Sequence, residues 1–304
     1  MLVKNFLFHR VSPEPDSNWP PMKPSLFEKV IRFLVSNYHV VCLEQLLDSG
    51  NKLAKSRKTV ATVLFDDGYK DNIEYAAPIL RRFNCPASFY IVTDCINNNI
   101  PTWTYILDNA MSKTRARTIE IGLSYVPENL RRVEIEDKVK GTKVKPWMKT
   151  LANRERVEVL DIILDQCKDV IWPSGKMMTW QDIGQLKNDG FEIGSHSHTH
   201  PMLGALESLD EIETELTLSA DIIREQLGVR PRTISYPIGS FDERVKSLAK
   251  KTGYKYGLAV EGRFFQFHRD DLMTIPRVEL YQEEWWKVLV RMNSMYPMMK
   301  RIWT

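Results

Sequence analysis

The stretch Thr59-Val-Ala-Thr-Val-Leu-Phe-Asp-Asp-Gly68 joins a short apolar run to two adjacent acidic residues. The run from Thr59 to Phe65 is continuous and rich in β-branched side chains, which is typical of a strand buried on both faces of a sheet. Asp66 and Asp67 follow it without a linker. The sequence therefore predicts a buried strand with an acidic pair at its C-terminal end.

Similar apolar runs alternate with amphipathic stretches along the rest of the chain. The other expected strands are Leu2–His9, Val40–Cys42, Ala87–Val92, Phe191–Gly194, Thr233–Tyr236, Tyr256–Val260 and Ile275–Leu280. The expected helices begin at capping boxes (Ser25 with Glu28, and Ser208 with Glu211), contain Ile79-Leu80, start near Trp103, or cover Arg156–Cys167, Thr179–Asp189 and Phe241–Lys251. Roughly seven strands that alternate with helices predict an α/β fold with a parallel sheet, open or closed into a barrel.

The length of 304 residues fits one barrel domain. The segment Ser112 to Lys149 is rich in charge and lacks sustained periodicity, so we expect a partly mobile insertion at about 112–176. A C-terminal helix is expected at about 282–300. The expected organisation is a single domain, 1–304, with these two additions.

The composition excludes several classes of protein. Hydrophobic residues make up 43% and charged residues 27%, which is typical of a globular domain. A net charge of +3 is too small on this length to indicate nucleic-acid binding. The sequence has no apolar run long enough for a membrane span and no signal-peptide pattern. Four cysteines without a Cys-x-x-Cys pair favour a reducing compartment, so we expect a cytoplasmic protein or one peripheral to a membrane.

The acidic pair Asp66-Asp67 has two explanations. Adjacent carboxylates at the end of a buried strand repel each other, and burial increases that cost. A cation would remove the penalty, and one carboxylate could bind it while the other faces its bound water. The alternative is a turn, because Asp-Gly is common turn chemistry.

A second cluster is His196-Ser-His-Thr-His200. A His-x-x-x-His pair on a helical turn or tight loop brings two imidazoles within reach of one ion. Three of the six histidines fall in this segment, which favours a metal site over unrelated packing histidines. In an extended segment His198 would face the same way, as in a metal amidohydrolase with a His-x-His strand, but Pro201 indicates that the strand has ended.

Together the two clusters supply a set of three metal ligands. Asp67, His196 and His200 would bind one divalent metal ion and leave a position open for water. Asp66, which is not a ligand in this arrangement, could take a proton from that water. Zinc suits this set best, and cobalt, nickel or iron would also fit.

These motifs resemble those of the polysaccharide deacetylase (NodB-homology) family of carbohydrate esterases. Leu64-Phe-Asp-Asp-Gly-Tyr69 is similar to the first motif of that family and His196-Ser-His-Thr-His200 to the second. Ile234-Ser-Tyr-Pro-Ile-Gly-Ser-Phe-Asp242 resembles the third. Leu7-Phe-His-Arg-Val11 is similar to the start of a branch that begins with a Tyr-His-x-Val strand.

The resemblance implies a fold, a reaction and residue roles. The fold is a distorted (β/α)7 barrel, and the reaction is hydrolysis of the acetamide of an N-acetylated sugar or, in some members, of an O-acetyl ester. Asp66 matches the catalytic base, and Asp67, His196 and His200 match the metal ligands. A backbone N–H near Ile238 is expected to hold the oxyanion.

Two parts of the family pattern are missing. Ser235 stands where the third motif usually carries an arginine that orients the base; Arg277 could replace that arginine, or it could form an ordinary surface ion pair. The C-terminal Leu-x-His motif, which supplies the general acid, is also absent. His9 is the expected acid, because in the Tyr-His-x-Val branch the acid comes from that strand. The alternatives are His268 and a structural role for His9.

The sugar site is expected to include Tyr69, Tyr236, Pro237, Ile238 and Arg277. Aromatic faces stack on sugars, although both tyrosines could instead pack in the core. The expected substrate is an N-acetylated sugar, an oligosaccharide or a lipid-linked saccharide. The Trp285-Trp286 pair and the basic C-terminal tail could touch a membrane, with a helix docked on the barrel as the simpler interpretation.

The predicted function is therefore metal-dependent removal of an acetyl group, N-acetyl in the first place, from a sugar or polysaccharide. One alternative is a metal amidohydrolase of another type. A second is a catalytically inactive sugar-binding domain, which the missing arginine and displaced acid motivate. The presence of Asp66 beside a complete ligand set favours the enzyme, because a binding domain needs no base beside a metal.

Overall fold

The computed structural model describes residues 1–50, 57–135, 144–171 and 175–293. At its centre is a nine-stranded sheet in the order β10-β1-β3-β4-β7-β8-β9, with β2 beside β3 and β11 beside β1. The predicted central strand, now β3, is buried along its whole length. The strands are β1 (Leu2–Phe8), β2 (His39–Val40), β3 (Val60–Phe65), β4 (Ser88–Ile91), β7 (Glu192–Ser195), β8 (Thr233–Ser235), β9 (Tyr256–Leu258), β10 (Phe265–Gln266) and β11 (Val278–Glu279).

The sheet curls into a distorted barrel. From β1 through β3, β4, β7 and β8 to β9, neighbouring strands pair in parallel. Leu258 of β9 then forms a parallel bridge with Ile275, and β11, which follows that bridge, pairs in parallel with β1. β10 runs antiparallel to β1. The closing contacts are short, so the barrel is uneven around its circumference.

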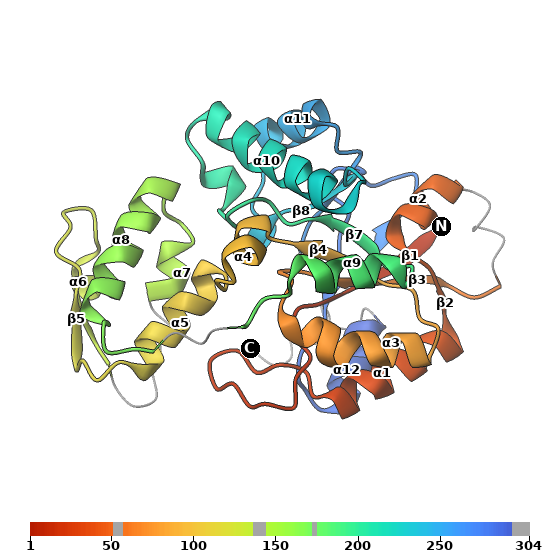
Figure 1. Ribbon diagram of the computed structural model, residues 1–304, viewed down its shortest axis with the longest axis horizontal. Helices are drawn as coiled ribbons and strands as arrows, with labels where there is room; N and C mark the ends of the chain where they lie inside the picture. Colours follow the sequence, from red (N-terminus) through yellow and green to blue (C-terminus); the bar gives the residue numbers. More distant parts are fainter. Residues whose placement is uncertain (51–56, 136–143, 172–174, 294–304) are drawn as a thin grey trace.

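Helices cover the outer face of this sheet (Figure 1). Figure 1 shows α10 and α11 packed together above the sheet, and α1, α3 and α12 grouped below it. Because strands and helices alternate, the segments that leave the C-terminal ends of the strands meet at one edge of the barrel. The helices are α1 (Pro24–Asn37), α2 (Leu43–Ser49), α3 (Ala77–Arg82, after a π-helical turn at Asn72–Ala76), α4 (Thr93–Asn98), α9 (Trp180–Asn188), α10 (Leu209–Leu227), α11 (Glu243–Thr252) and α12 (Trp285–Met292).

The starts of α1 and α10 differ from the expected capping boxes. At α1, Lys23 is the N-cap residue and Pro24 is the first helical residue, so the box expected at Ser25 is wrong. Proline suits this place, since its missing N–H would have no partner in the first turn. At α10, Ser208 does cap the helix, but through the N–H two residues later rather than in a box with Glu211.

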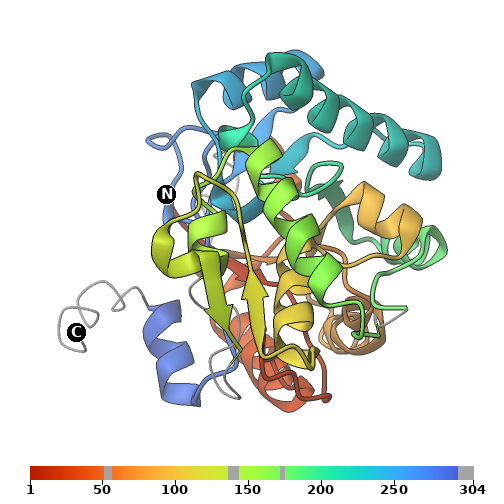
Figure 2. The same ribbon diagram turned by 90° about the vertical axis from the view of Figure 1, so that its left-hand side faces the viewer.

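The described residues between α4 and α9 (99–135, 144–171 and 175–179) form a second, smaller unit beside the barrel, which we call the insertion unit (Figures 1 and 2). It has a hydrophobic core, to which α5 contributes Leu107 and Met111 and α8 contributes Val159 and Ile163, and which Met202 of the barrel joins. Short elements can bury such a core without a long amphipathic period. The elements are α5 (Trp103–Lys113), the antiparallel pair β5 (Thr118–Glu120) and β6 (Arg132–Glu134), α6 (Glu128–Arg131), α7 (Val144–Met148) and α8 (Asn153–Gln166).

The last described helix, α12, docks against α1. The ring of Trp285 packs edge-to-face on Phe33 with 5.7 Å between centroids, and Val288 and Met292 are buried. The expected helix at about 282–300 is thus observed over a shorter range, and the basic tail lies outside the described residues. None of the described helices combines the length and the apolar surface that crossing a bilayer requires.

Candidate active site

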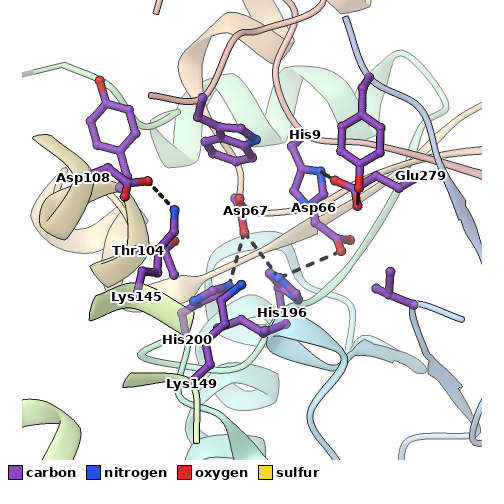
Figure 3. A pocket seen from close by; sticks show the side chains of 15 residues that line it. His9, Asp66, Asp67, Thr104, Asp108, Lys145, Lys149, His196, His200 and Glu279 are labelled. Carbon is purple, nitrogen blue, oxygen red and sulfur yellow. Dashed lines mark hydrogen bonds and ion pairs between the residues drawn. The ribbon is translucent and has the colours of Figure 1, made fainter. Parts of the chain in front are cut away.

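A cavity of about 310 Å³ lies where the segments after several strands meet (Figure 3). The segments after β1, β3, β7 and β8 contribute to it, and α5 and α7 of the insertion unit form part of its wall. The position agrees with the general rule that parallel barrels carry their chemistry at the C-terminal ends of strands. The lining residues are His9, Trp19, Asp66, Asp67, Thr104, Tyr105, Asp108, Lys145, Lys149, His196, His200, Ile238, Val260, Glu279 and Tyr281.

Asp67, His196 and His200 converge on one point in this cavity (Figure 3). The Asp67 Oδ1 atom lies 3.3 Å from Nε2 of His196 and 3.4 Å from Nε2 of His200. All three side chains are buried, and their ligand atoms lie within 4.8 Å of one another. Within the described ranges, this is the group of His, Cys, Asp and Glu side chains that could hold a metal ion.

The hydrogen bonding of the histidines fits a cation at that point. His196 Nδ1 lies 2.8 Å from the Ser235 carbonyl oxygen, so Nδ1 carries the proton and the lone pair of Nε2 faces the Asp67 carboxylate. Burial lowers the pKa of His200, which favours its neutral form. Two acceptors that face each other are unfavourable without a positive charge between them. Ligand atoms about 2.0–2.1 Å from one tetrahedral ion are about 3.4 Å apart, which matches the observed spacing.

The backbone around this group adopts unusual conformations. Asp67, Ser197, His200 and Ile238 have φ values of 76°, 65°, 61° and 58°. Non-glycine residues in this region each cost about 1–3 kcal/mol, and such strain tends to gather at functional sites. The left-handed turn at Asp67 also separates the two adjacent carboxylates, so that they point in different directions, as the sequence predicts.

Glu215 of α10 fixes the loop that carries the histidines. Its carboxylate accepts hydrogen bonds from the N–H groups of His198 and Thr199, each at 2.9 Å. The His198 ring does not belong to the group of Asp67, His196 and His200, and its Nδ1 atom lies 2.9 Å from Oγ1 of Thr93. The His-x-His arrangement of the amidohydrolase alternative is therefore not formed.

Asp66 is held by a separate set of partners on the other side of the strand end. Arg277 donates from Nη1 to Asp66 Oδ1 at 2.9 Å, and Ser235 donates from Oγ to Oδ2 at 3.0 Å. Arg277 also donates from Nη2 to the Ser235 oxygen at 2.9 Å, so three side chains form a closed network. Burial alone would raise the pKa of Asp66, but the Arg277 charge and hydrogen bond, with His196, keep it below its usual value.

Arg277 thus supplies the contact that the missing third-motif arginine would make. It is fully buried and does not line the cavity, so it lies behind Asp66 and not on the cavity wall where substrate-binding residues were expected. Ser235 leaves room for a guanidinium that comes from a different strand. The sequence had offered this replacement as one of two possibilities, and the surface ion pair is wrong.

His9 lines the cavity and pairs with a residue that sequence reasoning missed. Its Nδ1 atom lies 3.2 Å from Oε1 of Glu279, at the end of β11 (Figure 3). Burial alone would lower the pKa of His9, but Glu279, helped by Asp67 and Asp66, raises it to about 9. His268 is exposed and does not line the cavity. Glu279 could have been suspected because it lies two residues after Arg277 on the strand that closes the barrel.

The expected sugar-site tyrosines lie in the interior. Tyr69 and Tyr236 are 1% and 0% exposed, and neither lines the cavity. The Tyr69 hydroxyl forms a hydrogen bond of 3.1 Å with Oγ1 of Thr102. Pro237 is buried as well, whereas Ile238 does reach the cavity. A side chain that directly follows a strand can turn into the core as readily as into the site, so the two tyrosines cannot stack on a sugar.

Three other aromatic residues line the cavity in their place. They are Trp19, Tyr105 and Tyr281. Trp19 comes from the loop after β1 and packs edge-to-face on His9 with 5.3 Å between centroids. No spacing in the sequence relates these residues to the strand ends, which is why they were missed.

The chain matches the family model described as polysaccharide deacetylase over residues 53–257. It is also similar to Chitin deacetylase 1 of Cryptococcus neoformans, with 38% identity over 64 residues that cover 21% of this chain and 13% of that protein. A second relative is the uncharacterized protein YlxY of Bacillus subtilis, with 30% identity over 129 residues and 40% of each chain. The chain thus spans less than half the length of these two relatives.

Several solved structures share the fold. Deacetylase PplD of Streptococcus pyogenes in complex with acetate has a TM-score of 0.64 at 16% identity, covering 96% of this chain and 98% of that chain. IcaB of Ammonifex degensii has a TM-score of 0.63 at 13% identity, covering 96% and 97%. A de-N-acetylase from Aggregatibacter actinomycetemcomitans has a TM-score of 0.62 at 16% identity, covering 96% and 100%. These similarities confirm the predicted distorted (β/α)7 barrel.

Proposed function

Because the chain belongs to the polysaccharide deacetylase family, we propose that it is a carbohydrate deacetylase that hydrolyses the amide bond of an N-acetylated sugar. The observation that carries this proposal is that the two adjacent aspartates at the end of β3 have different partners. Asp67 faces His196 and His200, while Asp66 is held apart from that group by Arg277 and Ser235. A site for metal-assisted hydrolysis needs this combination of a ligand set and a free base.

Asp67, His196 and His200 would hold one divalent cation, and zinc is the ion we favour. When bound, such an ion polarises a carbonyl group and lowers the pKa of a water molecule to about 7. One carboxylate oxygen and two imidazole nitrogens suit zinc, and cobalt, nickel or iron would also fit. Removal of the ion with a chelator is expected to abolish activity, and adding zinc back is expected to restore it.

Asp66 acts as the general base in this proposal. Its Oδ2 atom lies 3.9 Å from Nε2 of His196, so this oxygen faces the ligand group and can accept the proton of an attacking water. Arg277 keeps the carboxylate ionised and fixes its orientation through Oδ1. The base is therefore ready at neutral pH.

His9 acts as the general acid that protonates the leaving amine. Glu279 occupies its Nδ1 side, which leaves Nε2 to donate a proton toward the cavity. With a pKa of about 9, His9 carries that proton at neutral pH. Ile238 reaches the same cavity, and a backbone N–H in its turn would stabilise the oxyanion.

The substrate we propose is an N-acetylated sugar, as a monomer, an oligosaccharide or a lipid-linked saccharide. A cavity of about 310 Å³ with aromatic residues on its wall suits such a ring. The missing arginine was a main argument for an inactive sugar-binding domain. Arg277 contacts Asp66 in its place, which weakens that alternative.

Metal analysis of matched histidine variants tests the ligand set. The wild-type protein and His198→Ala are expected to bind one ion per chain, and His196→Ala is expected to lose it. His198 is the matched control, because it lies in the same loop with its ring directed at Thr93. Equal loss of metal in both variants would favour the amidohydrolase arrangement instead.

Acetate release from a panel of N- and O-acetylated sugars tests the reaction. Asp66→Asn is expected to keep the ion and lose activity by about 10²–10⁴-fold, the range for a general base. Full activity in Asp66→Asn, or no release by the metal-loaded wild-type protein from any sugar, would refute the proposal.

A further inference from the structure

The insertion unit brings two lysines to the wall of the cavity. Lys145 belongs to α7, and Lys149 follows one helical turn later, with its N–H bonded to the Lys145 carbonyl oxygen. Both side chains line the same cavity as the metal-ligand group. Figure 3 shows them entering from the side of Thr104 and Asp108, with His9 and Glu279 on the other side of Asp67.

Lys149 is a charged residue of this cavity for which the described part of the structure shows no ion-pair partner, although the carboxylates of Asp108 and Glu279 lie near enough to act on it. Asp66 is paired with Arg277, Glu279 with His9, and Asp108 with Lys145. Among the residues that the structure describes, no hydrogen bond or ion pair engages the Lys149 ammonium. Asp67 faces the two histidines and would be neutralised by a cation.

The surroundings of Lys149 make this surplus charge costly. Burial, and then the neighbouring Lys145, lower the pKa of Lys149, and the carboxylates of Asp108 and Glu279 offset only part of that effect. Two adjacent ammonium groups with restricted access to water repel each other, and a negatively charged ligand would relieve that repulsion. A lysine that served solubility alone would extend into water rather than line a cavity.

We propose that Lys149, with Lys145 beside it, binds a negatively charged group, a phosphate or a carboxylate, on the sugar whose acyl group lies at the catalytic centre. This inference rests on the proposed deacetylase function and narrows its substrate class to acidic or phosphorylated amino sugars. An ammonium offers three donors and accepts many orientations, which suits a substituent on a sugar ring.

Binding of unreactive amino sugars tests the inference without catalysis. Isothermal titration calorimetry would compare glucosamine with glucosamine 1-phosphate, glucosamine 6-phosphate and muramic acid on the metal-loaded wild-type protein. All four carry the same amine; the two phosphates differ from glucosamine by the phosphate alone, whereas muramic acid adds a carboxylate on a lactyl ether. At least one charged probe is expected to bind about tenfold or more tightly than glucosamine, as a charge-assisted hydrogen bond provides. Equal or weaker binding of every charged probe would overturn the inference.

Three lysine variants locate the effect. In Lys149→Met, the ratio of charged-probe to glucosamine affinity is expected to fall toward one, and Lys149→Arg is expected to keep most of that ratio. Lys168→Met is the matched control, because Lys168 belongs to the insertion unit but is exposed and pairs with Asp165. A general structural defect would weaken all probes alike and leave the ratio unchanged, which would also count against the inference.

A second measurement on the metal-loaded wild-type protein distinguishes failure of the inference from failure of the proposed function. Acetate release would be measured with N-acetylglucosamine, its 1- and 6-phosphates and N-acetylmuramic acid. Release at equal kcat/KM from neutral and charged sugars supports the deacetylase and refutes the anionic substrate. Tighter binding of a charged probe that depends on Lys149, without release from any acylated sugar, supports the binding site and refutes the deacetylase.

Discussion

The Glu279 carboxylate lies against His9 and faces no other histidine in the described cavity. It raises the pKa of His9 to about 9, so the proposed acid stays protonated through neutral pH and loses its proton as the pH rises through that value. The alkaline limb of kcat/KM is therefore set in part by Glu279. Replacing the carboxylate with an amide removes the charge that stabilises the imidazolium, and the pKa of His9 then falls.

We predict that Glu279→Gln moves the alkaline limb of kcat/KM to lower pH by about one unit or more. The measurement is the pH profile of acetate release between pH 5 and 10 at constant ionic strength. Glu283→Gln is the control, because Glu283 pairs with Arg291 outside the cavity and its loss should leave the limb in place. An unchanged limb in Glu279→Gln would show that His9 is not the titrating acid.

A second prediction about a single residue concerns Arg277. Arg277→Met leaves Asp66 buried without its partner, and breaking a buried pair in this way costs about 3–5 kcal/mol of unfolding free energy. Activity should fall with it, because the pKa of Asp66 rises and its orientation is lost. Urea unfolding and acetate release would be measured on the same preparation.

The control for Arg277 is Arg263→Met. Arg263 pairs with Glu261 and Asp270, but its side chain is 43% exposed, so its loss should change the unfolding free energy by about 1 kcal/mol or less. If Arg277→Met were as stable as this control, the buried network around Asp66 would not be a structural requirement of the site.

The sequence could predict residues that directly follow strands, and much less of the rest. Asp66, Asp67 and His196 stand at strand ends, where the geometry of a parallel barrel already brings them together. Lys149 reaches the cavity through the insertion unit, and no spacing in the sequence relates that segment to β3. Glu279 lies near the end of the expected strand Ile275–Leu280, but that this strand closes the barrel beside β1 follows from tertiary packing.

Strand β7 shows how closely the elements near the site are packed. A Cβ atom at Gly194 would lie 2.4 Å from the Tyr90 ring and 3.2 Å from the Thr233 carbonyl oxygen. Gly194 stands two residues before His196, so any shift of β7 displaces a proposed ligand. The glycine is therefore needed for space.

We predict that Gly194→Ala lowers the unfolding free energy by about 1–3 kcal/mol through overpacking and weakens metal binding. Gly184→Ala in α9 is the matched control, because nothing lies within 4 Å of its Cβ position. Replacing a helical glycine with alanine there should stabilise the protein by about 0.5–1 kcal/mol. A neutral Gly194→Ala would mean that Tyr90 can move aside at little cost.

Element positions were predicted best where apolar runs are continuous. β1 and β3 appear close to the expected ranges, since burial on one or both faces leaves a clear pattern, and α5 begins at Trp103, where a helix was expected to start. The insertion unit was harder, because outside α5 and α8 its core is built from short segments that each contribute a few apolar residues. The composition of this segment is rich in charged residues, and it did not reveal that the apolar residues among them pack into a core.

At the scale of the molecule, the barrel and the insertion unit contribute different parts of one cavity. The barrel supplies Asp66, Asp67 and the proposed ligands His196 and His200 near strand ends, and the insertion unit supplies Lys145 and Lys149. Chemistry and substrate selection would then depend on two cores, which meet where Met202 and Ile238 of the barrel join the core of the insertion unit. Damage to the second core should therefore affect substrate binding before it affects the metal.

Substitutions at Val159 and Val157 on α8 test whether damage to the core of the insertion unit affects substrate binding before metal binding. Val159 is fully buried in the core of the insertion unit, whereas Val157 is 46% exposed on the same helix. Val159→Asp places an unpaired carboxylate in that core and should open the unit locally. We predict that Val159→Asp retains one metal ion per chain but loses about tenfold or more of kcat/KM, the scale of a lost charged contact, while Val157→Asp retains both. Metal analysis, hydrogen exchange of α5 and α8, and acetate release would be compared in the two variants. Loss of the metal in Val159→Asp would mean that the two cores unfold as one cooperative unit, and undiminished activity would mean that the lysine wall is dispensable.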